Sequence, residues 1–220
     1  KIELAWPYAA RYFPRQEKII SVVGGPLRKE ILESAESALT QSEAKKALGF
    51  GEEKPLVAVL GGSLGSRRIN DFIAKNLPLF LENFNILHQT GDYTERGGHY
   101  QAYPFLDDKL ALAYAAADAI ISRAGSTIFE IAAFGKPSIL IPLKESANDH
   151  QKINAYQYAR TGAAIVLEEN QLSGQSALEQ LKKITADGEP RRNMEAAASA
   201  FAKRDAAVLV AGDIVGAIKP

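Results

Sequence analysis

The sequence predicts an α/β fold with a mostly parallel sheet and helices on both of its faces. Short apolar runs alternate with longer segments of helical periodicity along most of the 220 residues. Several runs are almost continuously apolar, as expected for strands covered on both faces. Two of them end in glycine-rich turns that lead directly into a helical segment. Repeated units of this kind favour parallel strands joined by right-handed crossovers.

The expected strands are the apolar runs bounded by turn residues, and the expected helices lie between them. The helix that begins at Ser42 takes this serine as its N-cap, and Gly135 ends another helix. In chain order, the strands are expected at 19–24, 55–61, 84–90, 101–105, 118–123, 137–143 and 163–167. The helices are expected at 27–39, 42–48, 67–76, 107–116, 126–135, 150–161, 171–184, 190–201 and 203–218, with loops at 49–55 and 91–98.

Composition excludes several classes of protein. The chain has 26 Lys and Arg against 26 Asp and Glu, and these charges are scattered, so we expect no nucleic-acid partner. It has no cysteine, which excludes a disulfide scaffold and fits a reducing cytosol. No apolar run reaches the roughly 18 residues that span a bilayer. The chain begins in an apolar stretch without Met or a signal peptide, and we expect it to be a fragment that lacks an upstream part.

A phosphate site is the first functional prediction, on the segment VAVLGGSLGSR at 57–67. A strand would deliver the chain to the carboxyl edge of the sheet, where glycines let the backbone turn and approach a ligand closely. The helix that starts near Ser66 would point free N–H groups and its positive dipole end at the same place. The predicted phosphate loop is Gly61, Gly62, Ser63, Leu64 and Gly65. The alternative is an ordinary turn.

A second small-residue turn, Gly125-Ser126-Thr127, follows the strand expected at 118–123, and Glu130 lies in the first turns of the next helix. A carboxylate accepts hydrogen bonds and can pair with both hydroxyls of a ribose diol. The alternative is that Glu130 only compensates the helix dipole. With both turns on one sheet edge, one would hold a diphosphate and the other a nucleoside.

Two further residues complete the predicted pocket. Gln151 opens the helix after strand 137–143, and its amide both donates and accepts, which suits sugar hydroxyls. The alternative there is a simple helix cap by Asn148 or Asp149. Arg28 follows the turn VVGGPLR at a helix start, where it opposes the dipole and calls for an anionic partner. The alternative for Arg28 is a surface salt bridge.

These segments, in this order, resemble the MurG family, the bacterial GT-B glycosyltransferases of peptidoglycan synthesis. The resemblance covers nearly the whole chain and rests on VVGGPLR, GGSLGSRRIN, YPFLDD, SRAGSTIFEIAAFGKPSILIPL and NDHQKINA. It implies the carboxyl-terminal, Rossmann-like donor domain of a GT-B enzyme, which binds UDP-GlcNAc. Arg28 and Ser63 would contact the diphosphate, and the backbone of Leu106 the uracil. Gly125, Ser126, Thr127 and Glu130 would surround the nucleoside, with Glu130 on the ribose and Gln151 on the sugar hydroxyls.

The chain also departs from this family. It has Gly25 where the family usually has Asn, and segment 123–130 is one residue shorter than in some members. We expect the chain to lack the family's amino-terminal acceptor domain, which carries a glycine-rich loop with a proposed His base, the lipid I site and a membrane-docking patch. We therefore expect no catalytic residue in this chain, and none of His88, His99 and His150 is predicted as the base. The domain division that follows is a remnant at 1–18, the donor domain at 19–200, and a helix at 201–220 that packs toward the missing domain.

The implied function is an inverting transfer of GlcNAc from UDP-GlcNAc to lipid I, which makes lipid II for the cell wall. The fragment alone is expected to be inactive. The resemblance implies no cofactor and no metal, and the chain contains no Asp-x-Asp pair. It implies a cytoplasmic enzyme at the inner face of the plasma membrane, which reaches the membrane through the missing domain.

Three other functions stay open. One is the donor subunit of a two-chain transferase that acts on a lipid-linked sugar. Another is a different GT-B reaction such as UDP-GlcNAc 2-epimerisation. The third, of a different class, is a non-catalytic nucleotide-binding or protein-interaction module.

Overall fold

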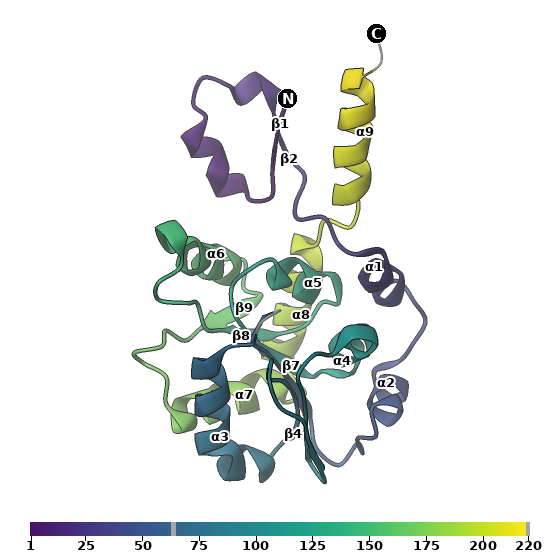
Figure 1. The fold of residues 1–220 in the computed structure, drawn as a ribbon, viewed down its shortest axis with the longest axis vertical. Coiled ribbons are helices and arrows are strands. Elements are labelled where there is room, and N and C mark those ends of the chain that lie inside the picture. Colours follow the sequence, from purple (N-terminus) through teal and green to yellow (C-terminus); the bar gives the residue numbers. More distant parts are fainter. Residues whose placement is uncertain (63–64, 219–220) are drawn as a thin grey trace.

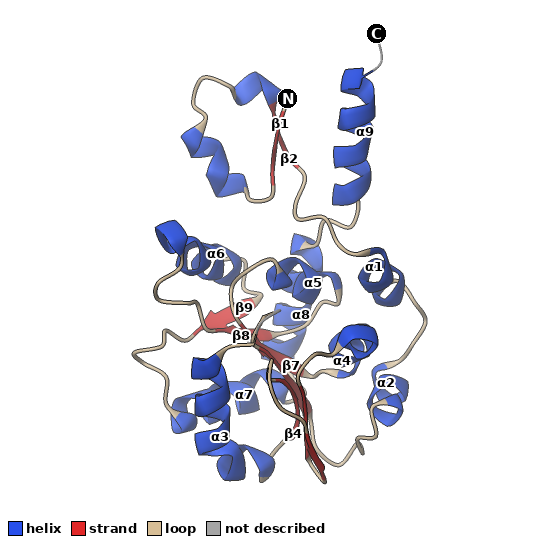
Figure 2. Cartoon of the chain, in the orientation of Figure 1, coloured by secondary structure: helices blue, strands red, loops and turns tan. Residues whose placement is uncertain are grey.

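The computed structural model describes residues 1–62 and 65–218. Its body is a seven-stranded sheet with strand order β5-β6-β4-β3-β7-β8-β9, flanked by helices (Figures 1 and 2). The strands of this sheet are β3 (Leu56–Leu60), β4 (Asn85–Gln89), β5 (Glu95–Gly97), β6 (Tyr100–Tyr103), β7 (Ala119–Ser122), β8 (Ser138–Leu140) and β9 (Ala164–Val166). All neighbouring pairs are parallel except β5 with β6.

Helices α1 to α8 cover the two faces of the sheet, which confirms the predicted α/β arrangement, while α9 lies outside these layers. The α-helices are α1 (Lys29–Ala35), α2 (Gln41–Ala47), α3 (Arg67–Leu81), α4 (Leu110–Ala116), α5 (Thr127–Ala133), α6 (His150–Ala159), α7 (Gly174–Thr185), α8 (Glu189–Phe201) and α9 (Ala206–Ile218). Short 3-10 helices are η1 (Pro7–Tyr12), η2 (Glu17–Ile19), η3 (Asp107–Lys109) and η4 (Ala147–Asp149).

The central strand β3 shows why its sequence is continuously apolar. Its five residues are all buried, because successive side chains point to opposite faces and both faces are covered. Leu56, Ala58 and Leu60 enter a core shared with α1, α2, α4, α5 and α6. Val57 and Val59 enter a second core with α3, α7 and part of α8.

The strand order places the edge at which a ligand can bind. From β3 the chain builds outward through β4 to β6, and then crosses over by α4 to β7 on the other side of β3. The loops after β3 and β7 therefore leave the sheet in opposite directions and open a crevice at its carboxyl edge. The glycine turns predicted from the sequence are the two loops at this switch point.

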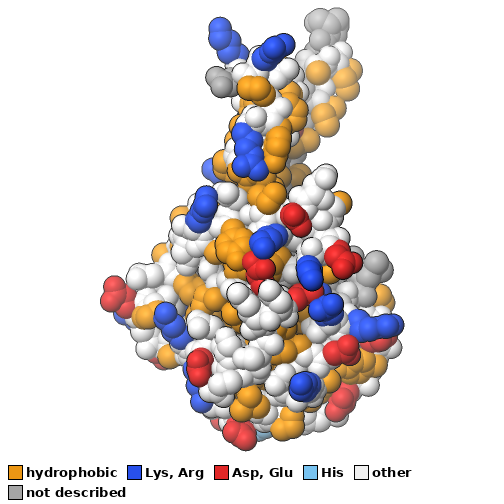
Figure 3. Space-filling view, turned by 90° about the vertical axis from the view of Figure 1, so that its left-hand side faces the viewer, with side chains coloured by type: hydrophobic (Ala, Val, Ile, Leu, Met, Phe, Trp, Pro, Cys, Tyr) orange, Lys and Arg blue, Asp and Glu red, His pale blue; other side chains and the backbone are white. Residues whose placement is uncertain are grey.

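The first 22 residues and α9 project from one end of the body (Figure 1). β1 (Ile2–Leu4) pairs in parallel with β2 (Ile20–Val22) in a separate two-stranded sheet. The strand predicted at 19–24 therefore exists, but it does not join the main sheet. Its partner is the unpredicted β1, and this pairing depends on a contact between distant residues. In Figure 3, hydrophobic side chains are visible along this projecting part.

The projecting segment is anchored by aromatic side chains. Trp6 is 8% exposed and lies 5.2 Å from the ring of Phe129 and 5.4 Å from that of Phe201, measured between ring centroids. The Tyr8 hydroxyl donates to Oδ1 of Asn154 at 3.0 Å. Lys1 pairs with Asp213 of α9 at 2.5 Å. Residues before 19 thus pack on the body and on α9, and the division of the chain at 18 and 200 stays a prediction.

Several element boundaries differ from those predicted. α2 is capped by Thr40 and not by Ser42, because the Thr40 hydroxyl accepts from the N–H of Glu43 while the Glu43 carboxylate accepts from the N–H of Thr40. α3 continues past Pro78 to Leu81, where Phe80 is fully buried. The loop predicted at 91–98 contains the short strand β5, whose exposed residues Glu95–Gly97 lack an apolar pattern and pair only with β6.

Candidate functional site

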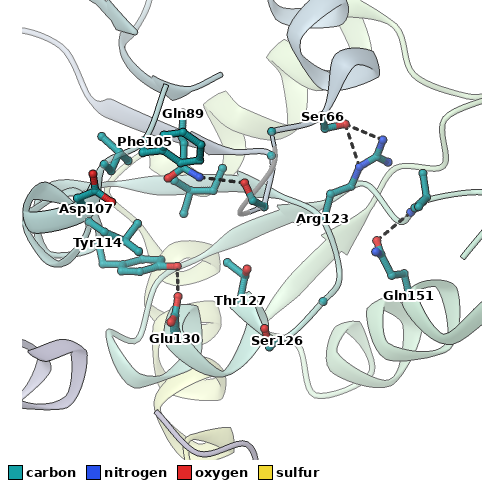
Figure 4. Close-up of a pocket in the computed structure, with 18 of the residues that line it drawn as sticks. Ser66, Gln89, Phe105, Asp107, Tyr114, Arg123, Ser126, Thr127, Glu130 and Gln151 are labelled. Atoms are coloured by element: carbon teal, nitrogen blue, oxygen red, sulfur yellow. Dashed lines mark hydrogen bonds between the residues drawn. The ribbon is translucent and has the colours of Figure 1, made fainter. Parts of the chain in front are cut away.

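A cavity of about 870 Å³ lies at the carboxyl edge of the sheet, between the turn after β3 and the turn after β7 (Figure 4). Its walls include every described residue of the predicted site, namely Arg28, Gly61, Gly62, Gly65, Leu106, Gly125, Ser126, Thr127, Glu130 and Gln151. Ser63 and Leu64, also predicted, lie outside the described residues. Folding thus gathers residues that are up to 123 positions apart in the sequence, while their role in binding stays a prediction.

The turn after β3 requires glycine at two positions. A Cβ on Gly61 would lie 2.6 Å from the backbone nitrogen of Ser66. Gly65 has a φ of +71°, and a Cβ there would lie 2.2 Å from the carbonyl oxygen of Thr90. The backbone therefore folds tightly onto itself and brings the N-terminus of α3, capped by Ser66, up to the cavity.

A buried polar network supports this turn from behind. Asn70 of α3 donates to the carbonyl of Thr90 at 2.7 Å, and its Oδ1 lies 3.1 Å from Nε2 of His88. The other ring nitrogen of His88 lies 3.0 Å from the Tyr100 hydroxyl. Burial lowers the pKa of His88 to about 4, so the imidazole stays neutral near pH 7. His88 is a structural residue, and neither His99 nor His150 is among the residues that line the cavity.

Arg123, at the end of β7, joins three parts of the cavity floor. Its Nε and Nη2 donate to the Ser66 hydroxyl at 3.1 and 2.8 Å (Figure 4). Its Nη1 donates to the carbonyl of Ile141 at 3.0 Å. Nη1 also pairs with the buried carboxylate of Glu169 at 2.7 Å. Arg123 therefore fixes the start of α3 relative to the ends of β7 and β8.

The turn after β7 is held by a second buried side chain. Asn154 of α6 is 7% exposed, and its amide donates to the carbonyl of Ala124 at 3.2 Å. A Cβ on Gly125 would meet open space among the described residues. Gly125, Ser126 and Thr127 therefore border the cavity on a turn that is fixed from below and open above.

Glu130 occupies the first turn of α5, as predicted, and accepts hydrogen bonds from two sides. The hydroxyl of Tyr114 donates to its Oε2 at 2.6 Å, and Nη2 of Arg28 donates to its Oε1 at 3.0 Å. Arg28 precedes α1, as predicted, and its side chain is 57% exposed. The alternative of a salt bridge is thus realised for Arg28, and its partner is the other predicted charged residue of the site.

Gln151 lies in the first turn of α6 and lines the opposite end of the cavity. Its Oε1 accepts from the backbone N–H of Leu143 at 3.1 Å, and its own N–H donates to the Ser146 hydroxyl at 3.2 Å. Asn148 and Asp149 both take left-handed backbone angles, with φ of 51° and 53°, which is not the extended geometry of an N-cap. Asp149 holds the N-cap position of α6, as this alternative expects, but its side chain makes no cap hydrogen bond with the helix.

The departure at Gly25 has a steric reason. A Cβ on Gly25 would lie 2.4 Å from the ring of Phe129, which packs against Trp6. An asparagine at this position would displace Phe129 and with it the contact between the projecting segment and the body. Glycine at position 25 therefore leaves room for the ring of Phe129 in its contact with Trp6.

Sequence reasoning missed several residues that line the cavity or hold its walls. Tyr114 lies in an alanine-rich helix and reads as core, and only the fold brings it to Glu130. Gln89 and Arg123 could have been predicted as cavity residues, since each is a polar residue at the carboxyl end of a buried strand. Gln89 donates to the carbonyl of Gly62 at 2.9 Å. The other missed residues of the cavity wall include Ser66, Arg67, Arg68, Phe105, Asp107 and Leu143.

The charges at the cavity favour an anion. Arg28, Arg67, Arg68 and Arg123 all line it, against the carboxylates of Asp107 and Glu130. Glu169 pairs with Arg123 and also with Arg68 at 3.3 Å. Within residues 1–62 and 65–218, no three His, Asp or Glu side chains gather to hold a metal ion, and no helix is long and apolar enough to cross a membrane.

Comparison with known proteins places the chain in a family. The model of the glycosyltransferase family 28 C-terminal domain matches residues 56–210. Two curated relatives, from Thermodesulfovibrio yellowstonii and Clostridium botulinum, are each 35% identical, over 92% and 83% of this chain. Both are named UDP-N-acetylglucosamine--N-acetylmuramyl-(pentapeptide) pyrophosphoryl-undecaprenol N-acetylglucosamine transferase. The alignments cover 57% and 54% of these relatives, so the chain spans about half their length.

Solved structures agree on the fold. MurG of Acinetobacter baumannii superimposes with a TM-score of 0.67 at 24% identity, over 94% of this chain and 62% of that chain. The calicheamicin glycosyltransferase CalG4 superimposes with a TM-score of 0.62 at 16% identity, over 91% and 48%. These likenesses confirm the GT-B fold class predicted from the sequence. With most of its length matched by the family model and the predicted glycine turns inside the matched range, the chain belongs to the glycosyltransferase family 28 C-terminal domain family.

Proposed function

We propose that this chain is the donor-binding half of an inverting GT-B glycosyltransferase that moves GlcNAc from UDP-GlcNAc to lipid I and so forms lipid II for peptidoglycan. The single observation that carries the proposal is the cavity, in which both glycine turns, Glu130 and Gln151 line one space of about 870 Å³. That volume is within the range of small-molecule sites. The family and the names of the relatives support the same reaction.

In this proposal the donor lies along the cavity from Glu130 to Gln151. The uracil lies at the backbone of Leu106, and the ribose hydroxyls donate to the carboxylate of Glu130. The diphosphate lies at the turn after β3 and the N-terminus of α3, where free N–H groups and the helix dipole favour negative charge. Gln151 uses its Oε1 to hold Leu143, so its Nε2 is the group that donates to a hydroxyl of the sugar.

The chemistry assigned to this half is stabilisation of the leaving group. The acceptor hydroxyl attacks the anomeric carbon from the face opposite the diphosphate, and the bond to the diphosphate oxygen breaks with its electron pair leaving on UDP. Arg28 and the N–H groups of the turn stabilise the charge that develops on UDP, which lowers the barrier. The proton of the acceptor passes to a base outside this chain, and no metal takes part.

The acceptor site and the contact with the membrane are assigned to a second domain outside this chain. The whole enzyme would then work in the cytoplasm at the inner face of the plasma membrane, where lipid I is available. The balanced charge of this half supports the absence of a nucleic-acid partner. This half alone is expected to bind the donor and not to turn it over.

Calorimetric titration of the chain with UDP and with UDP-GlcNAc tests the proposal. Both ligands should bind, and in NMR spectra they should shift the signals of Ser63 and Glu130. Gln151→Ala should lower the affinity for UDP-GlcNAc about fivefold, because one hydrogen bond is lost, and leave the affinity for UDP unchanged. The matched control is Gln157→Ala, on the same helix but not among the cavity residues, which should change neither affinity.

Two results would contradict this assignment. Absence of any response at millimolar UDP would remove the donor site. Equal loss of UDP and UDP-GlcNAc affinity in Gln151→Ala would place this residue away from the sugar and leave only a nucleotide-binding module.

A further inference from the structure

Tyr114 joins the two helices that frame the nucleoside end of the cavity. It lies in α4, is fully buried, and donates its hydroxyl to Oε2 of Glu130 in α5 at 2.6 Å (Figure 4). Its ring stacks on Phe134, with 5.2 Å between centroids and 24° between planes. Ring packing holds the hydroxyl in place, so the hydrogen bond has little freedom to shift.

This hydroxyl stays protonated near neutral pH and is therefore a donor. Burial raises the pKa of Tyr114 well above its ordinary value, and the negative charge of Glu130 raises it further. A protonated phenol beside a carboxylate can only donate to it. Hydrogen bonds to a charged acceptor are shorter and stronger than neutral ones, in keeping with the distance of 2.6 Å.

The two oxygens of Glu130 are therefore held differently. Oε2 is bound by a buried group that cannot leave without unpacking the core. Oε1 is bound by Arg28, whose side chain is 57% exposed and can move away. The carboxylate of Glu130 thus keeps one orientation. Its Oε1 can accept a hydrogen bond from a ligand when the guanidinium of Arg28 moves away.

Such an arrangement prepares a carboxylate for a ligand. A glutamate side chain that is free to rotate loses rotamer entropy when a ligand fixes it, and this loss weakens binding. Contact with Tyr114 orders the side chain during folding, so this cost does not weaken binding. Without the hydroxyl, Glu130 would keep its charge but lose its fixed direction.

We propose that Tyr114 is a positioning residue for recognition of the ribose, whose hydroxyl fixes Glu130 so that the carboxylate distinguishes a ribonucleotide from a 2′-deoxyribonucleotide. The inference rests on the proposed function, because it takes Glu130 as the acceptor for the ribose hydroxyls. It goes beyond that function by naming the group on which this selectivity depends. If Tyr114 only stabilised the fold, its ring would be sufficient and its hydroxyl would not be needed. One substitution can remove the hydroxyl and keep the ring.

Tyr114→Phe removes only the hydroxyl and keeps the stacked ring. Calorimetry with UDP and 2′-deoxy-UDP should show that the unaltered protein prefers UDP. In Tyr114→Phe we expect the affinity for UDP to fall about fivefold, while the affinity for 2′-deoxy-UDP changes less than about twofold. Glu130→Ala should also remove the preference for UDP over 2′-deoxy-UDP. Adding Tyr114→Phe to Glu130→Ala should cause no further loss, because Tyr114 acts only through Glu130.

Tyr158→Phe is the matched control. Tyr158 is also fully buried, but its hydroxyl has no hydrogen-bond partner among the residues that the structure describes. Its removal should leave both affinities and their ratio unchanged. If Tyr114→Phe does not fold, the hydroxyl proton of Tyr114 in the unaltered protein is the second measurement. This proton should stay protected from solvent exchange when UDP binds. Loss of this protection on binding would overturn the inference.

The outcomes separate the inference from the function on which it rests. If the unaltered protein does not bind UDP, the proposed function fails. If it binds UDP and prefers it to 2′-deoxy-UDP, and Tyr114→Phe keeps that preference, the inference alone is overturned. If the unaltered protein binds both ligands equally, Glu130 does not select the ribose, and the inference is overturned while the nucleotide site remains.

Discussion

The two edges of the central sheet both gather charged side chains, but they use them differently. At the amino edge, Asp118 pairs with Lys45 at 2.7 Å and with Arg191 at 3.1 Å, and it accepts from the N–H of Leu56 and from Gln41. The side chains of Asp118 and Lys45 are 7% and 9% exposed. At the carboxyl edge, Arg28 pairs with Glu130 but is 57% exposed.

The two pairs are similar in distance but differ in burial, so we expect burial of both partners to distinguish a structural ion pair from one that a ligand can open. Asp118 and Lys45 are enclosed, and Asp118 is paired and hydrogen-bonded within the protein. In the cavity, one partner is fixed by Tyr114 and the other faces solvent. Charged pairs are thus enclosed at one edge, and at the other they line the cavity in which we propose a donor site.

The largest expected effect is at the amino edge. Asp118→Ala should lower the free energy of unfolding by about 3–5 kcal/mol, because Lys45 would remain buried without its counter-charge and the N–H of Leu56 without its acceptor, while Arg191 keeps Glu195 as a partner. Urea denaturation measures this loss. The folded variant should bind UDP as the unaltered chain does. The control is Glu33→Ala, which breaks an exposed pair with Lys29 and should cost less than about 1 kcal/mol. Equal losses in the two variants would refute the contrast.

An intermediate effect is expected at His88, which supports the cavity from behind. Its pKa is lowered from 6.5 to about 4, so below pH 6.5 the unfolded chain takes up a proton that the folded protein does not. Above pH 6.5 the residue adds no pH dependence. As the pH falls from 6.5 toward 4, its contribution to the free energy of unfolding should fall by about 3 kcal/mol.

Comparison with His88→Gln isolates this effect from the titration of carboxylates, which both proteins share. At pH 7 the variant should be the less stable of the two, because the bonds to Asn70 and Tyr100 are altered. Urea denaturation at pH 4.5 should show this difference reduced by about 2–3 kcal/mol. A difference that stays constant between pH 7 and pH 4.5 would mean that the imidazole is protonated in the fold.

The smallest effect on stability is expected for Arg28→Ala. An exposed ion pair contributes little, so the free energy of unfolding should change by less than about 1 kcal/mol. The affinity for UDP should nevertheless fall about tenfold, because a charge-assisted contact to the diphosphate is lost. Calorimetry at two salt concentrations measures the affinity for UDP. The control is Lys29→Ala at the next position, which is not among the cavity residues and should leave this affinity unchanged. A variant that loses stability but keeps UDP affinity would make this pair structural, as at the amino edge.

Much of the fold could be predicted from local patterns. β3 is a continuous apolar run because both of its faces are covered, and Gly135 ends a helix because it takes a φ of +61°. Pairing between segments that are distant in the chain leaves no local pattern in the sequence from which a strand could be predicted. β1 and β5 are three residues long and were not predicted, because each is a strand only by virtue of its partner.

The site divides in the same way. The glycines at 61 and 65 and the carboxylate at 130 could be found from the sequence, since each follows a predicted strand or opens a predicted helix. Tyr114 and Asn154 could not be found, because their roles depend on a hydroxyl and an amide that reach residues in other elements. The pairing of Arg28 with Glu130 was also hidden, although each had been singled out alone.

By itself, the sequence determined the α/β class, the two glycine turns and part of the cavity wall, because strand periodicity and tight turns are local properties of the backbone. Only the tertiary structure decided which charges are enclosed and which are open. Burial and hydrogen-bond partnership are set by contacts between segments far apart in the chain. That is why Asp118, just before β7, is enclosed by its partners, while Glu130, in α5 after β7, lines the cavity.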